Sequence, residues 1–550
     1  PPPPPPPPPT PPLHDALPIC MRLGNIEARF VELGMAETGR TPYLSGLDGT
    51  VSGYAEHGRL VLDSRDVDVS DSRLFRDILA ISELQGELHW TQSADGMQLR
   101  TERLALVNPD MALLADFAMT LPASGKGTTL DLDVDVETAD IGRVHHYLPA
   151  KLMSLKGVTW LDNSLVSGQI RNGRVRIHGR LDQIPFDNDE GQLEARLPVF
   201  NATLDFNDGW TPITGLDAQV DFTGRSMDIT SSRGMIRTAA LRQVRARIPD
   251  LARPGLSIDG DVRGELSVML AELGSSPLGK RFGGFVDRAI TTGRCDLQLD
   301  IGIPLHGVNR EVSVAGRISL RDNTLKLKNS EIALGAIRGL LTFDGDGIAG
   351  DDLQTIMNGR PATVRVWGEP GKPDTHIRLD GKLGLLDVIL GKDSPLQRAA
   401  SGDSDWQVQL TVRGAPARGE QGDVGLHITS TLAGTAIDLP APFGKSAGSQ
   451  RALSVTVDNA AATLQRATFN YGDHLQGILL LDTRGSTTHL QRGTLTLGNG
   501  KAVLGDAAGL LLNGRIDSLS LSEWQPWMSE PQSGPAVPLR LDLDVGEFEV

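Results

Sequence analysis

The sequence predicts a mostly β protein: an elongated, twisted antiparallel sheet that curls into an open, taco-like groove and carries a few short helices. Three observations predict this fold. Apolar and polar residues alternate in several stretches, turn residues recur along the whole chain, and the composition combines 62 glycines with only 4% aromatic residues in 550. Such a composition is typical of many short strands and unfavourable for packed helices.

The alternation is clearest in residues 130–137 (LDLDVDVE) and recurs in residues 296–303 and 539–545. A period of two places every apolar side chain on one face of a strand and every polar side chain on the other. The sheet is therefore expected to have one apolar face and one charged face. The residues that we expect on the apolar face are Leu130, Leu132, Val134, Val136, Leu297, Leu299, Leu541 and Leu543.

Paired strands joined by tight turns predict how the sheet is built. Residues 46–51 lead through a turn to residues 58–62, and residues 85–90 lead to residues 96–101 in the same way. Strand, Gly- or Asp-rich turn and strand is the signature of a hairpin. A hairpin cannot bury its apolar face alone, so hairpins repeated over this length predict a stacked sheet, which twists and coils as it grows.

Helical spacing interrupts the strands in three places, near residues 138–156, 266–291 and 383–400. In the first, apolar residues follow helical spacing, with Thr138 as a candidate N-cap. Glycine, serine and proline at 274–277 break the second, and Pro395 interrupts the third. We expect these helices to plug the sheet locally.

Two regions make up the predicted domain organisation. Residues 1–20 begin with nine prolines, and residues 13–19 resemble a translated sequencing adapter, so we expect an artefactual or disordered segment outside the fold. Residues 21–550 form one continuous body, since no linker or charge run divides them. Residues 23–30 and 545–550 already have strand character, so we expect a fragment that is truncated at both ends.

The charge and cysteine content exclude several classes of partner. A formal net charge of −16 argues against nucleic acid and against a general basic patch for anionic lipid. Cys20 lies in the excluded segment, so Cys295 stands alone and predicts neither a disulfide framework nor a zinc site. No apolar run approaches the roughly 20 residues of a membrane helix.

The candidate chemical motifs are all weak, and we expect no cofactor, metal or catalytic residue. Residues 274–280 match a phosphate-binding loop up to Lys280, but Arg281 stands where a hydroxyl must bind magnesium, so we expect no nucleotide. The adjacent His145 and His146 lack the spacing of three or four that a helical metal site needs. The acidic turn at 187–190 lacks the glycine and the distal glutamate of a calcium loop. The sequence therefore predicts that the chain is not an enzyme.

Several stretches, in order over most of residues 40–530, resemble the YhdP family of the AsmA-like superfamily of Gram-negative bacteria. They are residues 147–151, 179–187, 190–195, 201–206 with Trp210, 321–325 and 439–448. The resemblance implies a large periplasmic protein, anchored in the inner membrane, with a long lipid-lined β-groove that moves phospholipid between the inner and outer membranes. It implies contact with both membranes through termini outside this chain, and no catalytic residues.

With this resemblance, we interpret the apolar face as the lining of a groove in which phospholipid acyl chains lie against the eight residues named above. The structural alternative for these residues is a dry core packed against a second layer. The functional alternative is a structural or assembly factor for the outer membrane without lipid transport, as suggested for relatives in the TamB branch.

Overall fold

The computed structural model describes residues 24–38, 41–275, 289–305, 312–327, 333–345, 347–368, 374–390, 398–413, 424–458, 463–482, 489–498, 500–528 and 538–549. Contacts divide the chain into two compact units, which are described separately here. Unit 1 contains residues 1–202 and 219–227, and unit 2 contains residues 203–218 and 228–550.

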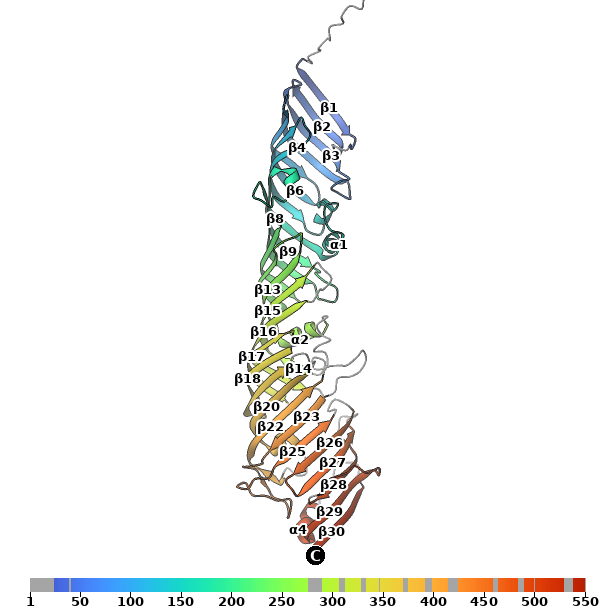
Figure 1. The fold of residues 1–550 in the computed structure, drawn as a ribbon, viewed down its shortest axis with the longest axis vertical. Coiled ribbons are helices and arrows are strands. Elements are labelled where there is room, and N and C mark those ends of the chain that lie inside the picture. Colours follow the sequence, from blue (N-terminus) through green and yellow to red (C-terminus); the bar gives the residue numbers. More distant parts are fainter. Residues whose placement is uncertain are drawn as a thin grey trace, which may run out of the picture. The chain divides into compact units, whose positions relative to one another are not determined.

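Unit 1 is built from long strands that follow one another along the sheet (Figure 1). Each strand from β1 to β8 pairs antiparallel with the next one in sequence. The turns that follow odd-numbered strands therefore share one edge of the sheet, and the turns that follow even-numbered strands share the other. The strands are β1 (Ile26–Met35), β2 (Tyr43–Gly53), β3 (His57–Ser70), β4 (Leu79–Ser93), β5 (Gly96–Val107), β6 (Met111–Pro122), β7 (Thr129–Asp140) and β8 (Leu165–Arg180).

Three strands have residues in both units: β9 (Gln192–Leu204), β10 (Ile213–Thr223) and β11 (Ser226–Ile236).

Unit 2 continues with antiparallel pairs until β28, where the pattern changes. The pairs β28–β29 and β29–β30 are parallel. Its remaining strands are β12 (Ala239–Ile248), β13 (Gly255–Glu265), β14 (Ala289–Thr292), β15 (Arg294–Pro304), β16 (Ser313–Leu327), β17 (Ala333–Asp344), β18 (Gly347–Met357), β19 (Arg360–Gly368), β20 (Thr375–Gly384), β21 (Ala400–Ser401), β22 (Asp403–Val412), β23 (Val424–Ser430), β24 (Ala436–Ile437), β25 (Leu453–Asp458), β26 (Leu464–Tyr471), β27 (Leu475–Asp482), β28 (His489–Leu497), β29 (Gly509–Ser520) and β30 (Leu539–Glu549).

Helices are few and short among the described residues. None of those within these ranges is long and apolar enough to cross a membrane. They are the 3₁₀ turns η1 (Val144–Tyr147) and η2 (Leu181–Gln183), the π-helical turn η3 (Leu386–Leu390), and the α-helices α1 (Leu155–Ser164), α2 (Leu266–Ser275) and α4 (Leu521–Met528).

The helix expected near residues 138–156 differs most from the structure. Strand β7 runs to Asp140, only η1 follows, and α1 begins at Leu155. Leu148 precedes Pro149 and is extended, with ψ of 148°, because a residue before proline is disfavoured in the helical region. The helix begins after Ser154, whose hydroxyl accepts a hydrogen bond from the Gly157 amide at 3.2 Å.

The other two helical predictions fall partly outside the described residues. Helix α2 begins at Leu266, but residues 276–288 lie outside the described ranges, and residues 289–292 form a strand. In the range 383–400, η3 occupies Leu386–Leu390 and residues 391–397 lie outside the described ranges. The sequence did not predict α4.

The mostly β, largely antiparallel fold is confirmed. Twenty-eight of the described strands belong to one sheet, and the remaining two, β21 and β24, pair with each other. The sheet is neither closed nor strongly curled, so the taco-like curl was the part of the expectation that went too far. Apolar alternation fixes which side chains share a face but sets no curvature. The prediction that residues 21–550 form one continuous body stays a prediction.

Candidate functional site

The apolar residues of β7 lie at the centre of a continuous apolar face in unit 1. Leu132 is paired with Phe117 of β6 and with Ile177 of β8, and Val134 is paired with Ala115 and Val175. Directly opposite residues in paired strands point to the same side of a sheet. Leu130 and Val136 follow the same alternation, so four of the predicted residues share one face.

The opposite face of the same strands carries a ladder of ion pairs. Asp135 contacts Arg174 at 2.9 Å, and Asp133 contacts both Arg176 at 2.8 Å and His178 at 3.1 Å. These side chains are well exposed, so each pair adds little to stability. Their main effect is to keep this face in water, which directs the apolar face the other way.

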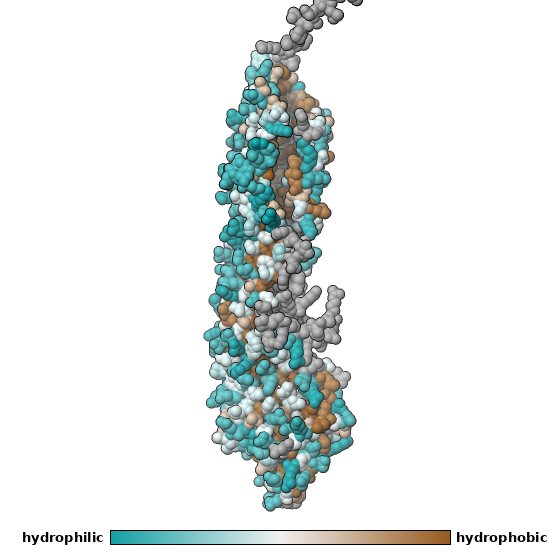
Figure 2. All heavy atoms as spheres, in the orientation of Figure 1, coloured by the Kyte–Doolittle hydropathy of each residue, from teal (hydrophilic) through white to brown (hydrophobic). Residues whose placement is uncertain are grey.

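The apolar face of unit 1 is incompletely covered. Leu130, Leu132 and Val134 are half-buried, and only Val136 of this set is buried. Figure 2 shows a hollow in this unit with apolar residues in and beside it. One buried cluster here contains Leu62, Val67, Ile81 and Leu84, and the partly buried residues packed on it all come from β1 to β5. The cluster is thus a single layer formed by the sheet itself.

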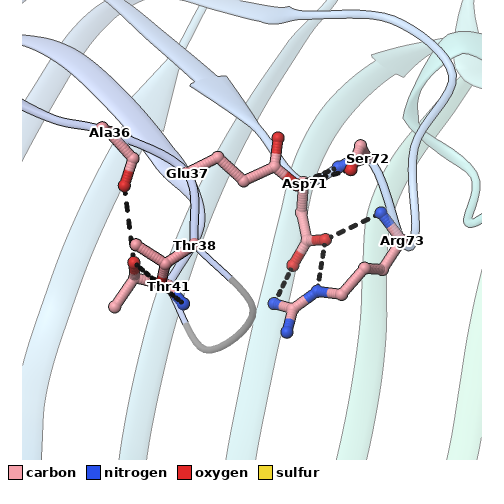
Figure 3. Close-up of polar contacts among 7 residues, drawn as sticks. All are labelled: Ala36, Glu37, Thr38, Thr41, Asp71, Ser72 and Arg73. Carbon is pink, nitrogen blue, oxygen red and sulfur yellow. Dashed lines mark hydrogen bonds and ion pairs between the residues drawn. The ribbon is translucent and has the colours of Figure 1, made fainter.

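One edge of this unit is fastened by polar contacts between turns (Figure 3). Glu37, after β1, accepts hydrogen bonds from the amide and the hydroxyl of Ser72, after β3, at 2.9 and 2.6 Å. Asp71 accepts two hydrogen bonds from the Arg73 guanidinium at 2.9 and 2.6 Å. The hydrogen bond with Arg73 holds the pKa of the Asp71 carboxyl below its usual value. This edge therefore stays ionised at neutral pH.

Further along the same edge, α1 is held by an ion pair. Arg76, in the turn between β3 and β4, contacts both carboxylate oxygens of Asp162 at 2.7 and 2.6 Å. The hydrogen bond with Arg76 lowers the pKa of Asp162. Leu155 at the start of α1 is 83% exposed, so this helix places apolar surface at the edge of the sheet.

The half-buried Tyr147 ties the turn η1 to the turn between β5 and β6. The Tyr147 hydroxyl donates to Asp110 at 2.8 Å and accepts from the Asn108 amide at 2.8 Å. Burial and the bond to Asp110 raise the pKa of Tyr147 to about 12. His146 lies 2.9 Å from Asp77. His145 and His146 thus lie in the contacts that hold η1 at this edge of the sheet. Burial lowers the pKa of His145.

Leu297 and Leu299 lie on an apolar face in unit 2 that has a second layer above it. Both are half-buried and pack against a buried cluster of Ala239, Leu241 and Val262. Met269 of α2 packs on the same cluster. Glu272 fixes α2 in place by contacting Arg237 at 2.8 Å and the Thr211 hydroxyl at 2.8 Å. Burial opposes ionisation of Glu272, but the hydrogen bonds outweigh it and lower its pKa.

Leu541 and Leu543 lie on β30, where the covering differs again. Leu541 is paired with Leu512 of β29 and is 63% exposed. Leu543 is paired with Gly514 and is half-buried. The eight predicted residues therefore fall on three separate stretches of apolar surface. The four residues of β7 share one face of their strand. The two residues of β15 and the two of β30 lie on other parts of the sheet.

The sequence did not predict an apolar cavity in unit 2. It lies over β16 to β23, is partly open to solvent with a free volume of only about 70 Å³, and is lined only by Leu, Ile, Val and Met residues. Alternation in strands such as residues 375–384 and 403–412 gives each lining residue its face. No local signal identifies the residues that enclose the cavity from above.

Comparison with known proteins identifies the family. A family model described as YhdP protein matches residues 16–550. A curated relative, "Intermembrane phospholipid transporter YhdP" of Escherichia coli (strain K12), is 24% identical over 439 residues, which cover 78% of this chain and 34% of the relative. The chain thus spans about a third of that relative's length. No solved structure matches the chain. The resemblance drawn from the sequence is confirmed: this chain belongs to the YhdP family.

Proposed function

We propose that this chain is a periplasmic part of a transporter that carries phospholipid between the inner and outer membranes of a Gram-negative bacterium. The acyl chains lie on the apolar face of unit 1, against Leu130, Leu132, Val134 and Val136. The observation that carries this proposal is the incomplete cover of that face, where an alternating strand keeps its leucines half-exposed. The name of the curated relative, a phospholipid transporter, supports phospholipid as the cargo.

Hydrocarbon chemistry makes this face a suitable surface for acyl chains. Burying one methylene is worth roughly 0.8 kcal/mol, so a long acyl chain that leaves water gains on the order of 10 kcal/mol. Head groups remain on the open side of the face, in contact with water. Neighbouring positions along such a face are chemically alike, since each strand contributes leucine, valine or another apolar residue. Movement between them needs no chemical step and no catalytic residue in this chain.

The same face explains why the chain would belong in the cell envelope. An exposed apolar surface of this length is a liability in water unless a ligand covers it. Between two membranes, phospholipid is the abundant apolar ligand. Anchoring in the inner membrane is a property that we propose for the full-length protein.

Native mass spectrometry of the 550-residue chain, purified from a Gram-negative host in mild detergent, tests the proposal. We expect co-purifying phospholipid, and we expect its amount to fall in Leu132→Asp and Val134→Asp, because a carboxylate on the apolar face repels acyl chains. Thr138→Asp is the matched control. It adds the same charge to the same strand, at an exposed position opposite Arg171.

Circular dichroism of each variant separates loss of lipid from loss of fold. A folded wild-type chain without lipid would contradict the proposal, and so would lipid content that is equal in Val134→Asp and Thr138→Asp. Either result would favour a structural role in the envelope.

A further inference from the structure

Helix α1, at the margin of the sheet in unit 1, turns large apolar residues toward solvent (Figure 1). Leu155 is 83% exposed and Trp160 is 45% exposed, and Leu152, just before the helix, is 72% exposed. A surface helix normally turns such residues toward the core. The exposed residues of α1 recur at spacings of three and four, so they share one side of the helix, which we call the outward arc: Leu155, Lys156, Thr159, Trp160 and Asn163.

Polar contacts hold the outward arc in a fixed orientation. The Lys151 amide donates to the Leu74 carbonyl, in the turn after β3, at 3.1 Å. Arg76 of the same turn binds both carboxylate oxygens of Asp162 in α1 and also donates to the His145 carbonyl at 3.2 Å. The segment is thus tied to this turn both before α1 and near the end of α1. A surface that is already ordered loses little conformational entropy when a partner binds.

The charges beside the outward arc favour an acidic partner. Lys151 and Lys156 are exposed, and neither takes part in an ion pair among the residues that the structure describes. Arg76 and His146 of the same edge, in contrast, each contact a carboxylate, at 2.6 and 2.9 Å. The two lysines are therefore cations beside exposed leucines with no carboxylate of this chain in contact. A partner with carboxylates in this place would be attracted, and one with cations would be repelled.

Two other occupants fit the outward arc less well. A second copy of this chain in a twofold dimer would bring the same lysines against each other. An anionic membrane surface would attract two lysines but repel the chain as a whole, whose formal net charge is −16. A protein that offers apolar residues beside carboxylates meets both requirements, and tryptophan is a frequent anchor in protein interfaces.

We propose that the outward arc of α1 is a docking site for an acidic amphipathic helix of another protein. The apolar residues of that helix lie against Leu155 and Trp160, and its carboxylates lie beside Lys151 and Lys156. A helix is the element that repeats apolar and acidic residues at the spacings of three and four found in the arc. The inference goes beyond the proposed function and does not depend on it, because it concerns the outside of α1 and not the apolar face of β7.

Site-specific cross-linking in the bacterium that encodes the protein tests this site. The photoprobe p-benzoylphenylalanine replaces Leu155 in the full-length protein, and cross-linked peptides are identified by mass spectrometry. We expect an adduct with one other protein, through a peptide in which acidic and apolar residues recur at spacings of three and four. The same photoprobe in place of Leu181 is the matched control and should give no such adduct. Leu181 is 37% exposed and follows β8, at the opposite edge of the sheet.

Charge reversal tests the role of the lysines. The double variant Lys151→Glu with Lys156→Glu should lower the yield of the adduct about tenfold, which corresponds to about 1.4 kcal/mol of binding free energy. A lysine in place of an acidic residue of the cross-linked peptide should restore the yield. Lys126→Glu, at an exposed position between β6 and β7 and so at the opposite edge, should leave the yield unchanged. Circular dichroism of the purified variants shows whether each one is folded.

Several outcomes would overturn the docking site. An adduct with phospholipid would make the arc a membrane contact, and an adduct between two copies would make it a self-interface. Absence of any adduct, a cross-linked peptide without acidic residues, or a yield that is unchanged in the folded double variant would equally contradict the proposal. None of these results alters the lipid content expected for Leu132→Asp and Val134→Asp, so failure of this inference and failure of the proposed function are distinguishable.

Discussion

Units 1 and 2 use the same strand pattern and treat its apolar face differently. In unit 1, the residues packed on the cluster of Leu62, Val67, Ile81 and Leu84 come from the strands of the sheet itself. In unit 2, the large buried cluster also includes a second layer above the sheet. That layer contains Met269 and Leu270 of α2, Val388 and Ile389 of η3, and Leu432 and Ile437 of residues 431–452.

The difference teaches that alternation alone does not distinguish a groove from a core. Leu132 of β7 and Leu379 of β20 both alternate with charged residues along their strands. Leu132 is half-buried, whereas Leu379 is buried because a second layer lies near it. Whether such a leucine is buried depends on a segment that covers the apolar face, and that segment comes from elsewhere in the chain.

The largest contrast should appear on truncating a leucine in each unit. Leu383→Ala removes a side chain with 0% exposure, and we expect it to lower the free energy of unfolding of unit 2 by about 2–5 kcal/mol. Leu132→Ala should lower that of unit 1 by about 1 kcal/mol, since the side chain is half-exposed before truncation. Hydrogen exchange resolved by strand measures both. Equal losses would contradict the contrast between an open face and a covered one.

The next effect concerns residues 431–452 of unit 2, which Lys445 ties together. Lys445→Met keeps the length of the side chain but removes the buried ammonium that donates to the carbonyls of Leu432, Thr435 and Ser446, so we expect a loss of about 2 kcal/mol. Faster exchange should be confined to residues 431–452 and the strands beneath them. Lys382→Met removes an exposed lysine from β20 and is the control. If both variants exchange alike, Lys445 does not hold residues 431–452 in place.

Sequence reasoning succeeded where the physical cause is local. Alternation predicted that Leu130, Leu132 and Val134 share a face, and the register of β7 with β6 and β8 places them so. The charged face follows from the same argument and is observed as the ladder of Asp133 and Asp135. The prediction that acyl chains bind these residues stays a prediction.

Sequence reasoning failed where segments that are distant in the chain contact one another. The position of α1 depends on Pro149 and on the contact of Asp162 with Arg76, which is 86 residues away in sequence. The turn η3, which contributes Val388 to the cavity, is tied to β22 by Arg360, which bridges Asp387 and Asp403. No spacing in the sequence predicts that bridge. Predicting the covers requires knowing which turns share an edge of the sheet.

A smaller effect should appear at the edge of unit 1 that holds α1 when the pH falls. The Arg76 hydrogen bond lowers the pKa of Asp162, so this contact stabilises the folded state above the ordinary carboxyl pKa. The stabilisation is lost as the pH falls through the lowered pKa. We expect α1 to detach in acid, at a cost of about 1 kcal/mol since both groups are partly solvated.

Fluorescence of Trp160 in α1 follows this change. Asp162→Asn should show the detached signal already at neutral pH and little further change on acidification. An acid transition of the same size in the variant would assign the effect to other carboxylates, such as Asp71.

The smallest effect is expected on the charged face of unit 1. Asp133→Asn removes the charge that Arg176 and His178 contact, and we expect a loss of roughly 0.5 kcal/mol, because exposed ion pairs are screened by water. Lipid content should not change, since Asp133 lies on the face away from Leu132 and Val134. Native mass spectrometry and urea denaturation of the same sample test both statements. A drop in lipid content comparable to that of Val134→Asp would mean that the two faces of β7 are not functionally distinct. The apolar face would then not be the specific binding surface for lipid.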